Sequence, residues 1–146
     1  MKRAEEACER FANGSVCAQA VLAVFAKDCG ISEALAMKLG VGYAGGIGMG
    51  GHTCGAVTGA VAVLGLVFGN ETPEDIEAKA KALEKVKSLR EAFEKEFGTL
   101  TCKELLNCDL STPKGIEKAK ENALFETTCP LFVKRCVELT HELLHE

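Results

Sequence analysis

The sequence predicts an all-α protein, a single compact helical domain of about six to eight helices. Apolar residues recur at helical spacing along most of the chain, and the alternating pattern of strands is nearly absent. Ser, Thr and Asp precede most of these segments and Gly follows them, as is typical of helix starts and stops. The 146 residues, 47% of them hydrophobic, suffice for one core, so we expect residues 1–146 to form one domain.

The first three helices are predicted from their boundary signals. Lys2–Phe11 is a short helix that ends at Asn13-Gly14. Ser15 is expected to cap the next helix, which carries an apolar face and ends at Gly30. Ser32 then caps a third helix, because charged and apolar residues follow it at helical spacing.

A glycine-rich loop is predicted before a central helix. Five of the seven residues in Gly45–Gly51 are glycine, and each Gly costs a regular helix about 1 kcal/mol relative to Ala. The segment must therefore use positive φ angles or allow close backbone approach. Thr53 is expected to cap the following helix, Cys54–Gly69. This helix is apolar on all sides, so we expect it to form the buried centre.

The longest helix is predicted to open at Thr72–Asp75 and to run to about Phe97, with Gly98 as its stop. Its predicted core-facing stripe consists of Ile76, Leu83, Val86, Leu89, Phe93 and Phe97.

Three shorter patterns complete the chain. Thr101–Glu104 fits a capping box that opens a short helix. Lys114–Phe125 is predicted to form one helix. Cys129-Pro130 opens the last helix, because Pro suits the first helical position.

Composition excludes several classes of function. The net charge is −4 and no basic stripe is present, so we expect no nucleic acid or membrane partner. The most apolar stretch, Ala56–Phe68, is too short to cross a bilayer. The first residues lack the pattern of a secretory signal, so we expect a cytoplasmic protein. In a reducing cytosol, eight cysteines indicate metal binding or reversible redox work more than structural disulfides.

Four of the cysteines follow a potential capping residue by one or two positions. The pairs are Ser15 with Cys17, Thr53 with Cys54, Thr101 with Cys102, and Thr128 with Cys129. Each thiol would lie in a first helical turn, where free N–H groups and the helix dipole stabilise a thiolate. Four such positions indicate thiolate chemistry. The other cysteines lack this setting and are expected to be packing or accessory thiols: Cys8, Cys29, Cys108 and Cys136.

The glycine-rich loop is the strongest local candidate for a binding element, because its N–H groups can point at a sulfur, a cluster or another anion. The candidate binding residues around it are Gly50, Gly51, His52, Gly55 and Gly59. His52 is two residues before Cys54 and could deprotonate it or share a metal. The structural alternatives are a tight turn with an incidental buried thiol and a histidine that faces water.

Other cofactor motifs are absent or out of context. The loop fits GxGxxG, but no strand precedes it, so we expect no nucleotide. CxxCH is missing, so covalent haem is not expected, and without CxxC the thioredoxin dithiol and the zinc-ribbon spacing are also missing. A site of four thiols must therefore be assembled from distant segments.

These residues resemble the C-GCAxxG-C-C family of redox-active proteins. The matching segments are Ser15–Leu22, Gly50–Gly59, Thr101–Leu106 and Cys129–Val133. One departure is that Cys54 precedes Gly55, so this chain reads CGAxxG. The resemblance implies a helical fold and a redox role. It also places the family's four cysteines on Cys17, Cys54, Cys102 and Cys129.

Two redox mechanisms fit four converging thiols. They could hold an iron–sulfur cluster or another metal and pass single electrons, or form dithiol/disulfide pairs that exchange two electrons. Four thiolates repel one another, so a metal or disulfides must relieve the charge, and we favour the metal. The alternatives are a zinc-stabilised structural or interaction domain and a scaffold whose cysteines only pack. Whether the protein is an enzyme, such as a thiol oxidoreductase, stays open. Expected partners are a redox protein of unknown identity and a second copy in a homodimer.

Overall fold

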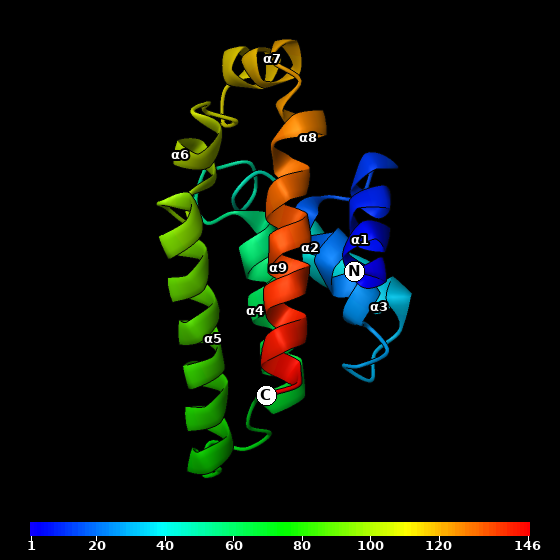
Figure 1. Ribbon diagram of the computed structural model, residues 1–146, viewed down its shortest axis with the longest axis vertical. Helices are drawn as coiled ribbons and strands as arrows, with labels where there is room; N and C mark the ends of the chain where they lie inside the picture. Colours follow the sequence, from blue (N-terminus) through cyan, green and yellow to red (C-terminus); the bar gives the residue numbers. More distant parts are fainter.

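Nine helical segments make up the chain in the computed structural model, which describes residues 1–146 and confirms the all-α prediction (Figure 1). The segments are α1 (Lys2–Ala12), α2 (Cys17–Phe25), α3 (Glu33–Val41), α4 (Gly55–Phe68), α5 (Ile76–Phe97), α6 (Cys102–Leu106), α7 (Pro113–Glu121), α8 (Leu124–Thr127) and α9 (Cys129–Leu144). The only extended pairing is one isolated antiparallel bridge between Thr53 and Thr101.

Helix α4 lies at the centre of the packing and contacts α2, α5 and α9. Figure 1 shows α5 and α9 running along the long axis, α1–α3 to one side, and α6–α8 at the upper end. A continuous core of 28 buried residues joins these elements. Gly59 permits the close contact between α4 and α2, because a Cβ there would come within 2.9 Å of the Ala18 carbonyl oxygen.

The burial of α4 and α5 differs from the prediction in one respect. The N-terminal part of α4 is buried, but Leu66 and Val67 near its end are exposed. In α5, Leu89 and Phe93 are fully buried, whereas Ile76 is 72% exposed. Leu83 is 61% exposed, so only the second half of the predicted stripe faces the core. The first half of α5 packs through another face, on which Ala78, Ala82 and Lys85 are half-buried. Lys85 there donates to the Leu143 carbonyl of α9 at 2.9 Å.

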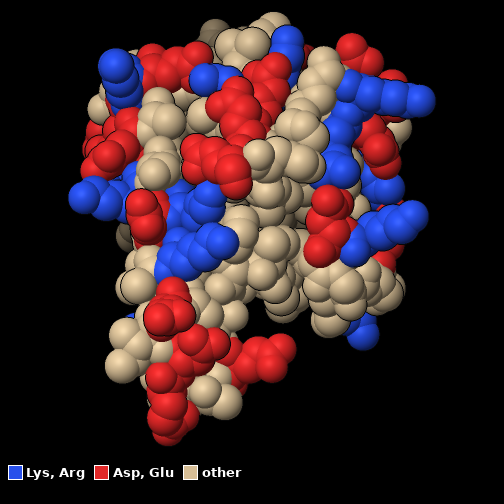
Figure 2. Space-filling model, turned by 60° about the horizontal axis from the view of Figure 1, so that its bottom comes forward, with Lys and Arg blue, Asp and Glu red and all other residues tan.

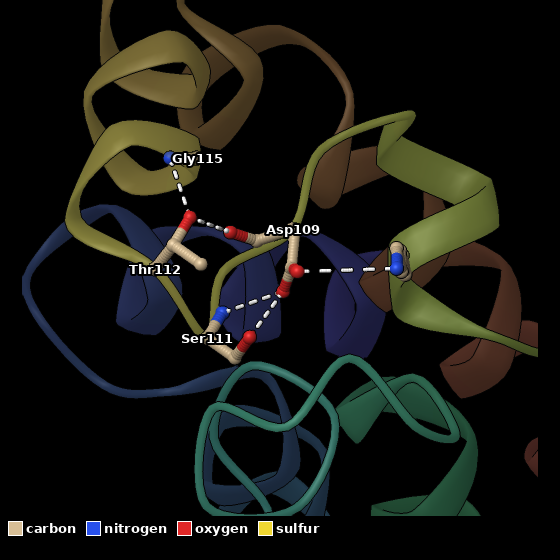
Figure 3. A network of polar contacts seen from close by, with 5 residues as sticks. Asp109, Ser111, Thr112 and Gly115 are labelled. Atoms are coloured by element: carbon tan, nitrogen blue, oxygen red, sulfur yellow. Dashed lines mark hydrogen bonds and ion pairs between the residues drawn. The ribbon is translucent and has the colours of Figure 1, made fainter.

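The segment Lys114–Phe125 is helical as predicted except for a break, because Ala123 adopts a left-handed φ of 52° and divides it into α7 and α8. A network of hydrogen bonds among Asp109, Ser111, Thr112 and Gly115 positions the start of α7 (Figure 3). Asp109 Oδ1 accepts bonds from the Ser111 N–H (3.0 Å) and hydroxyl, and Thr112 Oγ1 accepts from the Gly115 N–H at 3.0 Å. The chain passes so close here that a Cβ on Gly115 would collide with the Asp109 carbonyl.

Charged side chains of both signs are interspersed over most of the face in Figure 2, with acidic groups gathered on a projecting lobe at the lower left. A band without charged side chains crosses the middle of the same view. No helix of the protein combines the length and hydropathy that a membrane span needs.

Candidate functional site

All four singled-out cysteines lie at the N-terminal ends of helices. Cys17, Cys102 and Cys129 are the first residues of α2, α6 and α9, and Cys54 is the N-cap of α4. The predicted helix starts are therefore correct to within two residues. The predicted capping by Ser and Thr is wrong, because no Ser or Thr side chain caps any of these four helices.

Other contacts replace the predicted caps. Val16 is the N-cap of α2 in place of Ser15, and its N–H donates to Gln19 Oε1 at 2.9 Å. The predicted capping box at Thr101–Glu104 does not form. Thr101 instead pairs with Thr53 in the isolated bridge. Two threonines that the sequence presents as caps thus belong to a tertiary contact between the loop and α6.

The bridge places Cys54 beside Cys102. The Cys54 N–H donates to the Leu100 carbonyl at 2.8 Å, and the Cys102 N–H donates to the His52 carbonyl at 2.7 Å. Lys103 N–H adds a bond to the Gly51 carbonyl at 3.2 Å. These bonds fasten the start of α4 to the start of α6, although the two helices are far apart in the sequence.

The four cysteines line one cavity of about 190 Å³. This volume exceeds the engineered cavities of about 150 Å³ that stay dry in other proteins, whereas native interiors hold few voids larger than a water molecule. The remaining lining residues are Phe11, Ser15, Val16, Ala44, Gly45, Gly46, Met49, Gly55, Leu105, Leu106, Leu110, Phe125 and Phe132. None of them is charged, and none is a histidine. The lining side chains therefore carry sulfur, hydrocarbon and the single hydroxyl of Ser15.

Burial raises the pKa of all four thiols and so opposes the effect of the helix ends. It raises the pKa of Cys54 to about 11, although the backbone N–H groups of Ala56 and Val57 near the sulfur lower it. Burial also raises the pKa of Cys102 to about 12. The expectation of thiolates at all four positions omitted this desolvation, which favours the neutral thiol.

Cys17 and Cys129 interact directly. A hydrogen bond between the two side chains raises the pKa of Cys17, which burial raises further. The same bond lowers the pKa of Cys129, and this effect outweighs burial. Cys129 is therefore the one cavity thiol whose pKa lies below its ordinary value, with Cys17 as its hydrogen-bond donor.

The four cysteines line one cavity without forming a ready-made set of ligands for a single metal ion. No group of three or more His, Cys, Asp or Glu side chains is placed to hold one metal ion. A tetrahedral zinc ion needs its sulfur ligands at about 2.3 Å, which brings them close together. The arrangement thus differs from a preformed site for a single ion.

The predicted binding residues of the loop divide into two groups. Gly55 lines the cavity. Gly59 packs against α2, Gly51 against the side chain of Lys103, and Gly50 against the His52 ring. His52 is exposed and does not line the cavity. A role for these last four in cofactor binding stays a prediction without a cavity contact.

The remaining cysteines lie outside the cavity. Cys8 Sγ donates to the Pro130 carbonyl at 3.6 Å, and Cys29 Sγ lies 4.0 Å from the Val63 carbonyl oxygen. Cys108 and Cys136 are buried. All eight thiols are free.

Several apolar members of the site have no signal of their own in the sequence. Phe11 comes from α1, Leu105 from α6 and Phe125 from α8. Met49 belongs to the glycine-rich loop and could have been noticed as one of its two large residues, with Ile47. The others are ordinary apolar residues of amphipathic segments, and only the packing selects them.

Comparison with known proteins bears on these same residues. A family model described as "Putative redox-active protein (C_GCAxxG_C_C)" matches residues 15–143, a span that includes all four cavity cysteines. Comparisons with curated proteins and with solved structures gave no match. Because the family model covers most of the chain, this protein belongs to the C_GCAxxG_C_C family.

Proposed function

We propose that this protein carries electrons by means of an iron–sulfur cluster held by Cys17, Cys54, Cys102 and Cys129. The observation that carries the proposal is the cavity of about 190 Å³ that these four residues share. A cluster is the ligand that matches both its donor set, four cysteine sulfurs, and its open interior. Such a cluster supplies one-electron chemistry when bound.

Volume distinguishes a cluster from a single ion. Several iron and sulfide atoms separate the thiolates of a cluster, so its ligands surround a space. The four cysteines line one cavity, and no three potential ligands are placed to hold one ion, which supports a cluster over a single ion. A zinc-stabilised domain, the alternative from the sequence, has less support for this reason.

Charge gives a second argument for a metal. Four buried thiolates without a counterion would be very unfavourable, and no Lys, Arg or His lines the cavity. The positive charge must therefore come from the bound group. The chain contributes the N–H donors at Cys54 and an apolar wall that excludes water, and both influence a cluster's reduction potential.

Anaerobic reconstitution with iron and sulfide tests the proposal. We expect visible absorption bands, stoichiometric iron and sulfide, and a paramagnetic resonance signal on chemical reduction. Replacing any one of the four cysteines with Ala is expected to lower the iron content strongly. Cys8→Ala and Cys29→Ala are matched controls outside the cavity, and they should load as the wild type does. A protein that stays colourless and free of iron would contradict the proposal.

A second candidate function is favoured by the hydrogen bond between Cys17 and Cys129. The Cys129 thiolate would attack a disulfide of a partner, form a mixed disulfide and release one partner thiolate. Deprotonated Cys17 would then attack the Cys129 sulfur, closing an intramolecular disulfide and releasing the second partner thiolate. Two electrons pass to the partner in this exchange. Reversible oxidation of the iron-free protein, with loss of two free thiols, would support this function.

A further inference from the structure

The glycine-rich loop contains a run of left-handed backbone that extends beyond its glycines. Five consecutive residues, Gly45 to Met49, have φ between 56° and 79°. Two of them carry side chains, Ile47 at 63° and Met49 at 64°. Left-handed φ is uncommon for residues with a side chain and is an outlier for a β-branched one. Such strain persists only where the surrounding structure holds it, and it often marks a functional position.

Backbone hydrogen bonds hold this conformation. They run from Gly48 N–H to the Gly42 carbonyl (2.8 Å), Met49 to Ala44 (2.7 Å), Gly51 to Gly45 (3.0 Å) and His52 to Gly46 (2.9 Å). The loop is thus a hydrogen-bonded structure that fixes the direction of each of its side chains.

The two strained residues, Ile47 and Met49, lie in different surroundings. Met49 is half-buried and lines the cavity, whereas Ile47 is 48% exposed and does not line it. The Met49 sulfur lies against Gly45 so closely that a Cβ on Gly45 would collide with it. Gly45 is therefore required by its own φ of 57° and by the methionine that folds over it.

Met49 belongs to an apolar rim of the cavity. Four half-buried large side chains from different parts of the chain line the cavity at its partly exposed side: Phe11, Met49, Leu105 and Phe125. Three of the cavity cysteines are almost fully buried, with Cys54, Cys102 and Cys129 only 4%, 7% and 6% exposed. The fourth, Cys17, is half-buried. A flexible thioether side chain fills irregular gaps well, which suits a closing residue.

We propose that Met49 closes the solvent side of the four-cysteine cavity, and that the strained loop exists to hold it there. Met49 thereby keeps water and small electrophiles from the sulfurs. This proposal rests on the proposed function, because closing the cavity matters only if it holds thiolates or a cluster. The exclusion of water protects both. Its test is made on metal-free protein, so that its failure is distinct from a failure to bind a cluster.

The experiment measures how fast iodoacetamide alkylates each cysteine of the reduced, metal-free protein, by peptide mass spectrometry. We expect Met49→Gly to raise the rates at the three buried cavity cysteines, Cys54, Cys102 and Cys129, about tenfold, because more of the protein has an open cavity. Ile47→Gly is the matched control, since it relieves the same backbone strain outside the cavity, and its rates should stay within about twofold of the wild type. Met49→Leu restores the bulk and should react as the wild type does.

Two outcomes would overturn the proposal. One is equal alkylation rates in Met49→Gly and Ile47→Gly. The other is a parallel rise at Cys8 and Cys29, which lie outside the cavity and report general unfolding. If Met49→Gly does not fold, Met49→Ala takes its place, because it also removes the closing side chain.

Discussion

At the scale of single residues, burial decides the protonation of the thiols. Cys54 and Cys102 sit at helix N-terminal ends that favour a thiolate, yet desolvation raises their pKa values to about 11 and about 12. A dipole or a pair of N–H donors is a local effect, whereas desolvation depends on every segment that surrounds the sulfur. No side chain that lines the cavity is positively charged. A cation bound among the sulfurs would lower their pKa values and favour the thiolates.

The raised pKa values predict a loss of stability in alkali for the metal-free protein. Above the ordinary thiol pKa of 9.0, the unfolded chain releases protons from Cys54 that the folded chain retains up to about pH 11. The free energy of unfolding should therefore fall between these pH values, by on the order of 2 kcal/mol for Cys54. Urea unfolding at a series of pH values measures this fall. Cys54→Ala should flatten the curve, and an unchanged curve would contradict the assignment.

Strain at Ile47 predicts a stabilising substitution. Ile47→Gly should raise the free energy of unfolding by on the order of 1 kcal/mol, because the relief of left-handed strain exceeds the entropy cost of glycine. Ile47→Ala keeps a Cβ in the strained conformation and is the control, with little expected change. Urea denaturation compares the two. A glycine variant less stable than the alanine variant would show that the conformation is not strained.

At the scale of elements, helix contacts determine which glycines are needed. Gly59 and Gly65 both lie within α4. A Cβ on Gly59 would come within 3.0 Å of Ala18 Cα in α2, whereas nothing lies within 4 Å of a Cβ on Gly65. The sequence shows two similar small residues in an apolar helix. Only the position of α2 separates their roles.

Alanine substitutions of these two glycines should have opposite effects. Gly59→Ala should lower stability by on the order of 1–3 kcal/mol, because α2 must move away from α4. Gly65→Ala should raise it by about 1 kcal/mol through helix propensity alone. Thermal or urea unfolding of both variants measures the difference. Equal effects would mean that the close contact between α2 and α4 carries no energetic weight.

At the scale of the whole molecule, the exposed apolar residues bear on association. Ile76 and Leu83 on α5, with Leu66 and Val67 on α4, are exposed in the single chain. Surface residues of this kind are common in monomers when they are scattered, so they do not themselves establish an interface. The homodimer expected from composition stays a prediction. If the protein forms this homodimer, light scattering should give twice the 15.5 kDa chain mass. A value near 15.5 kDa would contradict the dimer.

The sequence by itself determined the helical class, the positions of most helices, the glycine-rich loop and the four cysteines at helix starts. These properties depend on near neighbours: apolar spacing, glycine punctuation and the residues around each start. The tertiary structure alone decided that Thr53 and Thr101 pair across segments, that Ala123 divides a helix and that Ile76 and Leu83 of the α5 stripe are exposed. It also decided that four cysteines line one mainly apolar cavity, to which Met49 contributes. Burial and partnership depend on residues distant in sequence, and no local pattern records them.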